Sequence, residues 1–276
     1  MPFYFLYVMI FISFLGGSSV YAADKKSRTV QGNIILSNEQ VNLFPKLFAD
    51  PYEIQMGFSK SLNSDRFIGR IGQEMPLFHF GPSNRKIHFS LGGHTWSLLT
   101  RRGNKFPLLA VDYLITGIFD FQLGDYSARF KISHISAHQG DFFSTQNNPK
   151  TARTYSQEFL SGLLARSYKW GNLYGGGHWL YNTIPKVKSI YLQVGSTFHL
   201  RKAFKNKYLP YISIDLQYHR SREYKLNQNY QIGYRLYQEG SREFRLASSY
   251  YSGFSIFGQN FNFREQFYSV GFFIDY

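Results

Sequence analysis

Cysteine is absent from this chain, and so is any long apolar run beyond its first residues. Without cysteine there is neither a disulfide framework nor a lipid-anchored N-terminal cysteine. After residue 22 no stretch of about 18 apolar residues occurs, which excludes a transmembrane helix from the rest of the chain. No linker divides the 276 residues into two halves. Together these absences favour one large domain built from strands.

The N-terminus predicts export from the cytoplasm. An uncharged apolar run at residues 3–15 is followed by small residues and then by Val20-Tyr21-Ala22. This pattern predicts a signal peptide over residues 1–22, cleaved after Ala22, although the usual positive charges before the run are missing. The alternative is a retained anchor, which the shortness of the run disfavours.

Aromatic residues and positive charge are abundant. The chain has 28 Phe, 22 Tyr and a net charge of +14, with a negative mean hydropathy. Many aromatics without helical hydrophobicity are typical of a membrane β-barrel. Because the basic residues are scattered along strands and loops of an exported chain, we expect them to face anionic lipid or a polar lumen, and we expect no nucleic-acid partner.

Apolar and polar residues alternate with a period of two, which presents one apolar face only in a strand. In the first strand Tyr52, Ile54, Met56 and Phe58 form the apolar set. The runs lie near residues 52–59, 66–79, 85–98, 108–121, 126–138, 154–167, 172–183, 189–201, 207–220, 228–238, 243–255 and 266–276. The sequence therefore predicts an all-β fold, a single transmembrane antiparallel barrel of about 12 strands over residues 52–276, after a periplasmic N-terminal segment at 23–51. A soluble sandwich or lipocalin-like barrel is the alternative.

The connections and the last strand support an outer-membrane barrel. Short turns such as 123–125 alternate with long loops such as 139–153 and 256–265, and in such barrels the long loops are extracellular. The strand at 126–138 then runs toward the cell exterior. The last strand ends on aromatic Tyr276, the kind of terminus that the barrel assembly machinery recognises. We expect a bacterial outer-membrane location, with membrane lipids, lipopolysaccharide and that machinery as partners.

A candidate catalytic pair lies at the outer end of this strand. Phe130 and Ile132 share the face expected to contact lipid, and the same alternation places His134, Ser136 and His138 on it. A serine two residues from a histidine on one strand face lies within reach of a hydroxyl–imidazole hydrogen bond.

The motif His-x-Ser also occurs at His88/Ser90 and His219/Ser221. The apolar alternation of their strands turns both of those pairs toward the lumen. Only His134 and Ser136 combine the lipid face with the outer end of a strand.

Glu158 is the candidate third member of a triad, because symmetric pairing about the 139–153 loop places it opposite His134. A register slip of one residue would turn Glu158 inward, in which case Asn147 and Asn148 are the alternatives. A metal site at His134, His138 and Asp141 is disfavoured, because on a strand the two histidines lie roughly 13 Å apart. We expect no cofactor, and polar residues at the headgroup level with no catalytic role remain the other interpretation.

The stretch from His134 to Asp141, the segments Leu43-Phe44-Pro45 and Ala49-Asp50-Pro51, and the run from Tyr155 to Glu158 resemble an uncharacterised family of bacterial outer-membrane proteins, a domain of unknown function. This resemblance covers most of the chain and implies the location and the fold.

A second resemblance is to the outer-membrane phospholipase A and lipid A deacylase barrels, which use an outward-facing His-x-Ser with Asn or Glu on a neighbouring strand. It rests on His134, Ser136 and Glu158, together with the aromatic last hairpin. Ala137 and His138 stand where the phospholipase has Asn-Gly, so the resemblance carries over neither oxyanion donors nor a calcium requirement. It implies a serine hydrolase of phospholipid or lipopolysaccharide acyl esters. The alternative is a non-catalytic barrel that serves as a narrow pore, an adhesin or a structural protein.

Overall fold

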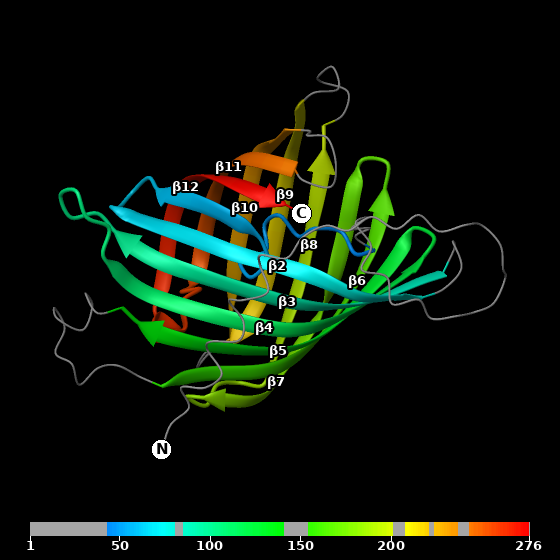
Figure 1. Ribbon diagram of the computed structural model, residues 1–276, viewed down its shortest axis with the longest axis horizontal. Coiled ribbons are helices and arrows are strands. Elements are labelled where there is room, and N and C mark those ends of the chain that lie inside the picture. Colours follow the sequence, from blue (N-terminus) through cyan, green and yellow to red (C-terminus); the bar gives the residue numbers. More distant parts are fainter. Residues whose placement is uncertain are drawn as a thin grey trace, which may run out of the picture. The chain divides into compact units, whose positions relative to one another are not determined.

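The computed structural model describes residues 43–80, 85–140, 154–200, 208–220, 224–236 and 243–275, which form a closed antiparallel β-barrel (Figure 1). The expected signal peptide at 1–22 and residues 23–42 of the expected periplasmic segment lie outside the described residues. Within the described ranges, no helix is long and apolar enough to cross a membrane.

Twelve strands make up the barrel, as the alternation predicted. They are β1 (Met56–Ser61), β2 (Arg66–Phe80), β3 (Arg85–Thr100), β4 (Leu108–Leu123), β5 (Tyr126–Gln139), β6 (Tyr155–Tyr168), β7 (Gly171–Ile184), β8 (Ile190–His199), β9 (Tyr208–Arg220), β10 (Tyr224–Leu236), β11 (Glu243–Phe254) and β12 (Arg264–Asp275). Each strand pairs with its sequence neighbours, and β1 closes the ring against β12. Because closure pairs every strand on both sides, the barrel has no open sheet edge.

Apolar side chains point out of the barrel and polar ones point in. Phe130, Ile132 and Phe272 are about half exposed, at 52%, 53% and 48%, whereas Arg129 and Ser133 from the same strand as the first two are buried. An apolar outer wall around a polar interior is the pattern of a barrel that sits in lipid. The soluble alternative requires the opposite arrangement.

The first strand is shorter than the alternation indicated. It begins at Met56, and Tyr52 and Ile54, which we expected on the lipid face, are packed inside the barrel. Ile54 is buried, and the ring of Tyr52 lies edge-on to Trp96 with centroids 5.8 Å apart. The same alternation therefore continues past the point where the chain leaves the wall and enters the lumen.

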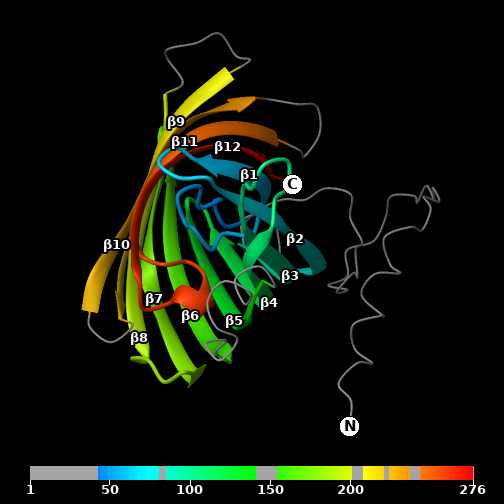
Figure 2. The same cartoon turned by 90° about the vertical axis from the view of Figure 1, so that its left-hand side faces the viewer.

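Residues 43–55 form a plug inside the ring of strands, dark blue in Figure 2. Phe44 packs against the guanidinium of Arg129, with 5.1 Å from ring centre to Cζ, and Phe48 packs against Arg245 at 4.1 Å. The side chain of Asn229 donates to the carbonyl oxygen of Ala49 at 2.6 Å. The described part of the segment that the sequence placed in the periplasm thus lies within the lumen.

Two buried arginines organise the polar interior around this plug. Arg129 donates to both carboxylate oxygens of Asp120, at 2.8 and 2.7 Å, and to Glu74 at 3.2 Å. Arg245 pairs with Asp275, at 2.5 Å in its closest hydrogen bond. Each arginine is held by more than one charge-assisted bond, which offsets the cost of burial. These side chains and the plug together fill much of the lumen.

The loop between β11 and β12 folds inward at the end of the barrel where β12 begins. Trp96 donates its indole N–H to the carbonyl oxygen of Ile256 at 3.2 Å, and the backbone N–H of Gly258 donates to Asp112 at 2.7 Å. The loop carries a short 3-10 helix, η3 (Gly258–Asn260), and its residues Ile256 and Phe257 join a buried apolar cluster. An apolar cluster inside a polar lumen was not predicted.

Gly176 lies where β6 and β7 approach closely. A Cβ atom at this position would collide with the backbone carbonyl oxygen of Gly162 on β6, whereas a Cβ atom at Gly93 of β3 would meet nothing within 4 Å. Gly176 therefore relieves crowding within the wall.

We expect Gly176→Ala to lower the free energy of unfolding by about 1–3 kcal/mol, because the added methyl group forces the two strands apart. Urea-induced unfolding from lipid vesicles measures the loss. Gly93→Ala is the matched control and should leave the unfolding midpoint unchanged. Equal midpoints for both variants would contradict the close approach.

Candidate active site

Strand β5 presents His134, Ser136 and His138 on the outer wall near its C-terminal end. His134 and His138 are exposed and Ser136 is half-buried, while Ile135 and Ala137 between them are buried. This is the facing that the alternation predicted.

The other His-x-Ser pairs do not share this facing. Ser90 is buried, and His88, half-buried, points into the barrel, opposite Asp120. The third pair, His219 and Ser221, lies outside the side chains that the structure describes.

Glu158 of β6 lies directly opposite His134. One carboxylate oxygen of Glu158 is 3.7 Å from Nδ1 of His134, and both side chains are partly exposed, at 33% and 47%. The register set by the loop length therefore holds, and no slip turns Glu158 inward. Asn147 and Asn148, the alternative partners, lie outside the described residues.

Asn182 is a member of this group that the sequence analysis missed. Its amide donates to the second carboxylate oxygen of Glu158 at 3.2 Å. Strand β7 has a bulge here: Glu158 pairs with Asn182, but the next residue, Phe159, pairs with Leu180. The extra residue, Tyr181, makes Tyr181 and Asn182 both point outward, where strict alternation would have turned Asn182 into the lumen. A bulge thus completes a row of polar side chains across three strands, His134–Glu158–Asn182.

Ser136 lies one row above this polar row, opposite Tyr113 of β4 and Ser156 of β6. The ring of Tyr113 meets His138 edge-on, with centroids 5.7 Å apart. In the described ranges Ser136 makes no hydrogen bond to either neighbouring histidine. Residues two apart on a strand face have Cβ atoms roughly 6.5–7 Å apart, so side-chain rotation suffices to bring the hydroxyl to the imidazole of His134.

The polar row borders an apolar belt. Directly below it Ile132, Leu160 and Trp179 occupy equivalent positions on the same three strands, and all three are exposed on the outer wall. Ile115 lies beside His134 on β4 and is 61% exposed. The site thus sits where an apolar surface gives way to polar side chains.

A second serine–histidine contact, which the sequence did not reveal, is buried in the lumen. Ser161 Oγ lies 2.7 Å from Nδ1 of His178, and Nε2 of His178 lies 2.8 Å from Oε1 of Gln193. The amide nitrogen of Gln193 donates to Asp215 at 2.6 Å, which orients its oxygen toward His178. His178 therefore carries its proton on Nε2, and Ser161 donates to Nδ1.

This geometry resembles an activated serine, but Ser161 is only 4% exposed. Its neighbours on the wall are other buried side chains, so we interpret the network as part of the lumen packing. The pair comes from two different strands, which is why no motif in the sequence marked it.

No metal site is evident in the residues with described positions: nowhere among them do three His, Cys, Asp or Glu side chains converge as ligands. Asp141, the third residue of the metal site that the strand spacing disfavoured, lies outside them.

One protein-family model and several solved structures match the chain. The family is described as a protein of unknown function (DUF1207), and its model matches residues 20–276. Among curated proteins, none matches the sequence.

Three of the similar structures are outer-membrane phospholipases. Outer membrane phospholipase A from Escherichia coli has 13% sequence identity and a TM-score of 0.52, over 83% of this chain and 95% of its own. An active-site mutant of the same protein has 15% sequence identity and a TM-score of 0.54, over 90% of this chain and 99% of its own. The Salmonella typhi outer membrane phospholipase dimer with bound calcium has 14% sequence identity and a TM-score of 0.52, over 90% of this chain and 99% of its own. At these identities the likeness is one of fold.

Proposed function

The chain belongs to the DUF1207 family, whose function is unknown, and we propose that it is an outer-membrane serine hydrolase that cleaves acyl esters of phospholipid or lipopolysaccharide. The observation that carries the proposal is the row His134–Glu158–Asn182 beside Ser136 on the outer wall. A histidine held by a carboxylate, with a serine on the same face, is the arrangement of an activated nucleophile.

In the proposed reaction Ser136 attacks the carbonyl carbon of the acyl ester while His134 takes its proton. His134 then gives this proton to the departing alcohol, and water hydrolyses the acyl-serine with His134 acting again as base. Glu158 orients His134 and offsets the charge of the imidazolium, and Asn182 holds Glu158 in place. The chain's own residues therefore supply nucleophile, base and positioning groups.

The surroundings of the site support a lipid substrate. The apolar belt below it offers a surface for acyl chains, and the loops at this end of the barrel expose Lys105, Lys186 and Lys188. Lysines at this level attract the phosphate groups of anionic lipids. If the long loops face the cell exterior, as in other barrels of this kind, the site acts on the outer leaflet.

The filled lumen argues against a pore as the main function. The plug at residues 43–55 and the inward loop of β11–β12 occupy the interior together with the buried arginines. Conductance across planar bilayers measures this directly, and we expect no stable open channel.

The direct test is release of fatty acid by the purified full chain in detergent micelles, with phosphatidylethanolamine and lipopolysaccharide as separate substrates. We expect release from at least one of them. No release from either would overturn the proposal and favour a non-catalytic barrel.

Glu158→Gln should lower kcat by about 100-fold with KM little changed, because the amide keeps the shape of the side chain but no longer stabilises the imidazolium. The measurement is initial-rate kinetics on the substrate that the wild type cleaves. Asn182→Ala should have a smaller effect in the same direction, since Asn182 acts only through Glu158. A wild-type rate for Glu158→Gln would remove Glu158 from the mechanism.

A further inference from the structure

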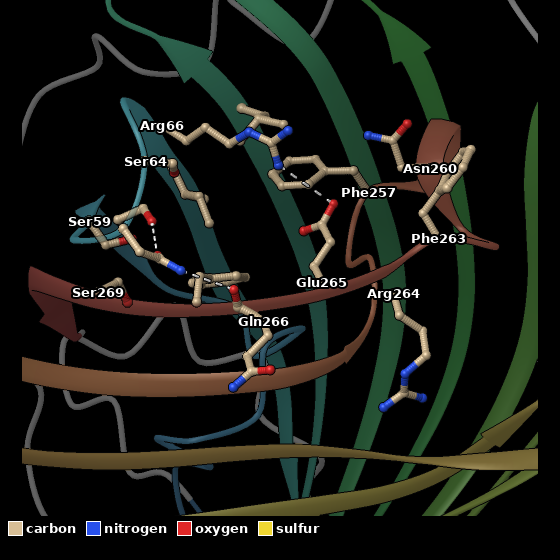
Figure 3. A pocket seen from close by; sticks show the side chains of 15 residues that line it. Ser59, Ser64, Arg66, Phe257, Asn260, Phe263, Arg264, Glu265, Gln266 and Ser269 are labelled. Atoms are coloured by element: carbon tan, nitrogen blue, oxygen red, sulfur yellow. Dashed lines mark hydrogen bonds and ion pairs between the residues drawn. The ribbon is translucent and has the colours of Figure 1, made fainter.

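A cavity of about 530 Å³ opens at the loop end of the barrel (Figure 3). It lies between β1, β2, the start of β12 and the inward loop 255–263. Cavities of roughly 300–1,000 Å³ are those in which proteins bind small ligands.

One side of the cavity is polar. Ser59, Ser61 and Ser269 line it from β1 and β12, with Ser61 directly opposite Ser269. At its opening Arg66 faces Glu265 across 3.9 Å, and the Arg66 side chain is half exposed. Because this ion pair is long and Arg66 is half exposed, Arg66 can exchange it for bonds to a ligand at little cost.

The other side is apolar and closed. Phe257, Ile68 and Leu98 are buried and belong to the cluster that fills the lumen beneath, and Phe267 packs against that cluster. Trp96 holds this floor in place through its hydrogen bond to Ile256. The cavity therefore ends in packed side chains and is a binding pocket, not the entrance of a passage.

The two sides together restrict the ligand. A purely apolar ligand would cover the hydroxyls and the charged pair without bonding to them, which is costly. A small anion would leave the phenyl floor uncovered and would meet the carboxylate of Glu265. A sugar has hydroxyls for the charged and hydroxyl groups and an apolar ring face for the phenyl rings.

We propose that this cavity binds a saccharide of about one or two rings. Glu265 and Arg66 bind its hydroxyls at the opening, and its apolar face lies on Phe267 and on the exposed ring of Phe263, above the buried Phe257. Neither the hydrolase proposal nor Ser136 is needed for this binding.

The test uses the full chain in detergent and titrates it calorimetrically with glucose, galactose, N-acetylglucosamine and lactose, and with glutamate as a zwitterionic alternative. We expect saturable binding of at least one sugar. Binding of glutamate alone, or of none of the sugars, would overturn the assignment.

Glu265→Gln should weaken sugar binding by about tenfold or more, because a charged hydrogen-bond acceptor is lost. Ser248→Ala, on the outer wall of β11, is the matched control and should bind the sugar like the wild type, as should Ser136→Ala. Should Glu265→Gln fail to fold, Arg66→Gln tests the other group at the opening. Unchanged affinity in a folded variant of either residue would exclude this cavity as the site.

Discussion

Ser136→Ala should abolish acyl-ester hydrolysis, with a loss of about 1,000-fold or more in kcat and an unchanged unfolding midpoint. The reason is chemical: the hydroxyl is the proposed nucleophile, and removal of a nucleophile leaves only what binding and polar groups contribute. Because the side chain is small and lies on the outer wall, its removal leaves the packing of the lumen untouched. Initial rates of fatty-acid release from the substrate cleaved by the wild type measure the effect.

Two serine variants make the result specific. Ser248 also faces outward, but the residue two positions before it is Leu246, whereas the residue two positions before Ser136 is His134. Ser248→Ala should therefore retain the wild-type rate. Ser161→Ala removes the hydroxyl that is hydrogen-bonded to His178 in the lumen and should keep the rate within about threefold. Loss of activity in Ser161→Ala with activity retained in Ser136→Ala would transfer the nucleophile to the lumen. A fluorophosphonate label that is found on Ser136 by mass spectrometry would identify the nucleophile independently.

Arg129→Ala should lower the free energy of unfolding by about 3–5 kcal/mol, the cost of leaving buried charges without their partner. The guanidinium is bound to Asp120 and to Glu74, all three side chains are buried, and Phe44 of the plug packs against it. Truncation leaves the carboxylates of Glu74 and Asp120 without their partner and removes the group against which the plug packs. Urea-induced unfolding from lipid vesicles measures the change.

The control for this prediction is the partly exposed pair Arg66–Glu265 at the cavity opening. Arg66→Ala breaks a 3.9 Å contact of a half-exposed side chain and should cost at most about 1 kcal/mol. Neutralising these three side chains, with Arg129→Met, Glu74→Gln and Asp120→Asn together, should recover much of the loss, because Glu74 and Asp120 are then no longer buried charges without a partner. Equal losses for Arg129→Ala and Arg66→Ala would show that burial of the network adds nothing to stability.

Much of the outer wall could be predicted from the sequence. The period of two fixed which side chains of β5 point outward, and the loop between β5 and β6 fixed the pairing of His134 with Glu158. Both are local properties: facing depends on parity along one strand, and hairpin register depends on the few residues that join two neighbours.

The bulge in β7 could not be predicted in the same way. A single extra residue, Tyr181, reverses the facing of Asn182, and nothing in the alternation of that strand marks it. The first strand shows the converse, since its alternation runs on through Ile54 and Tyr52 after the chain has left the wall. Parity identifies the two faces of a strand but not where the strand ends or where a residue is inserted.

By itself, then, the sequence determined the number of strands, the outward position of Ser136 and the partner of His134, because each follows from the alternation along one strand or from the pairing of neighbouring strands. Only the tertiary structure decided that residues 43–55 fill the lumen, that Asn182 joins the polar row, that Ser161 meets His178, and that a cavity forms beside Glu265. The plug and the cavity join segments that are distant in sequence, and their geometry is set by the curvature and closure of the ring, which no local pattern encodes. The contacts of Asn182 and Ser161 join the neighbouring strands β6 and β7, but neither the bulge in β7 nor the meeting of the two inward side chains is marked in the sequence.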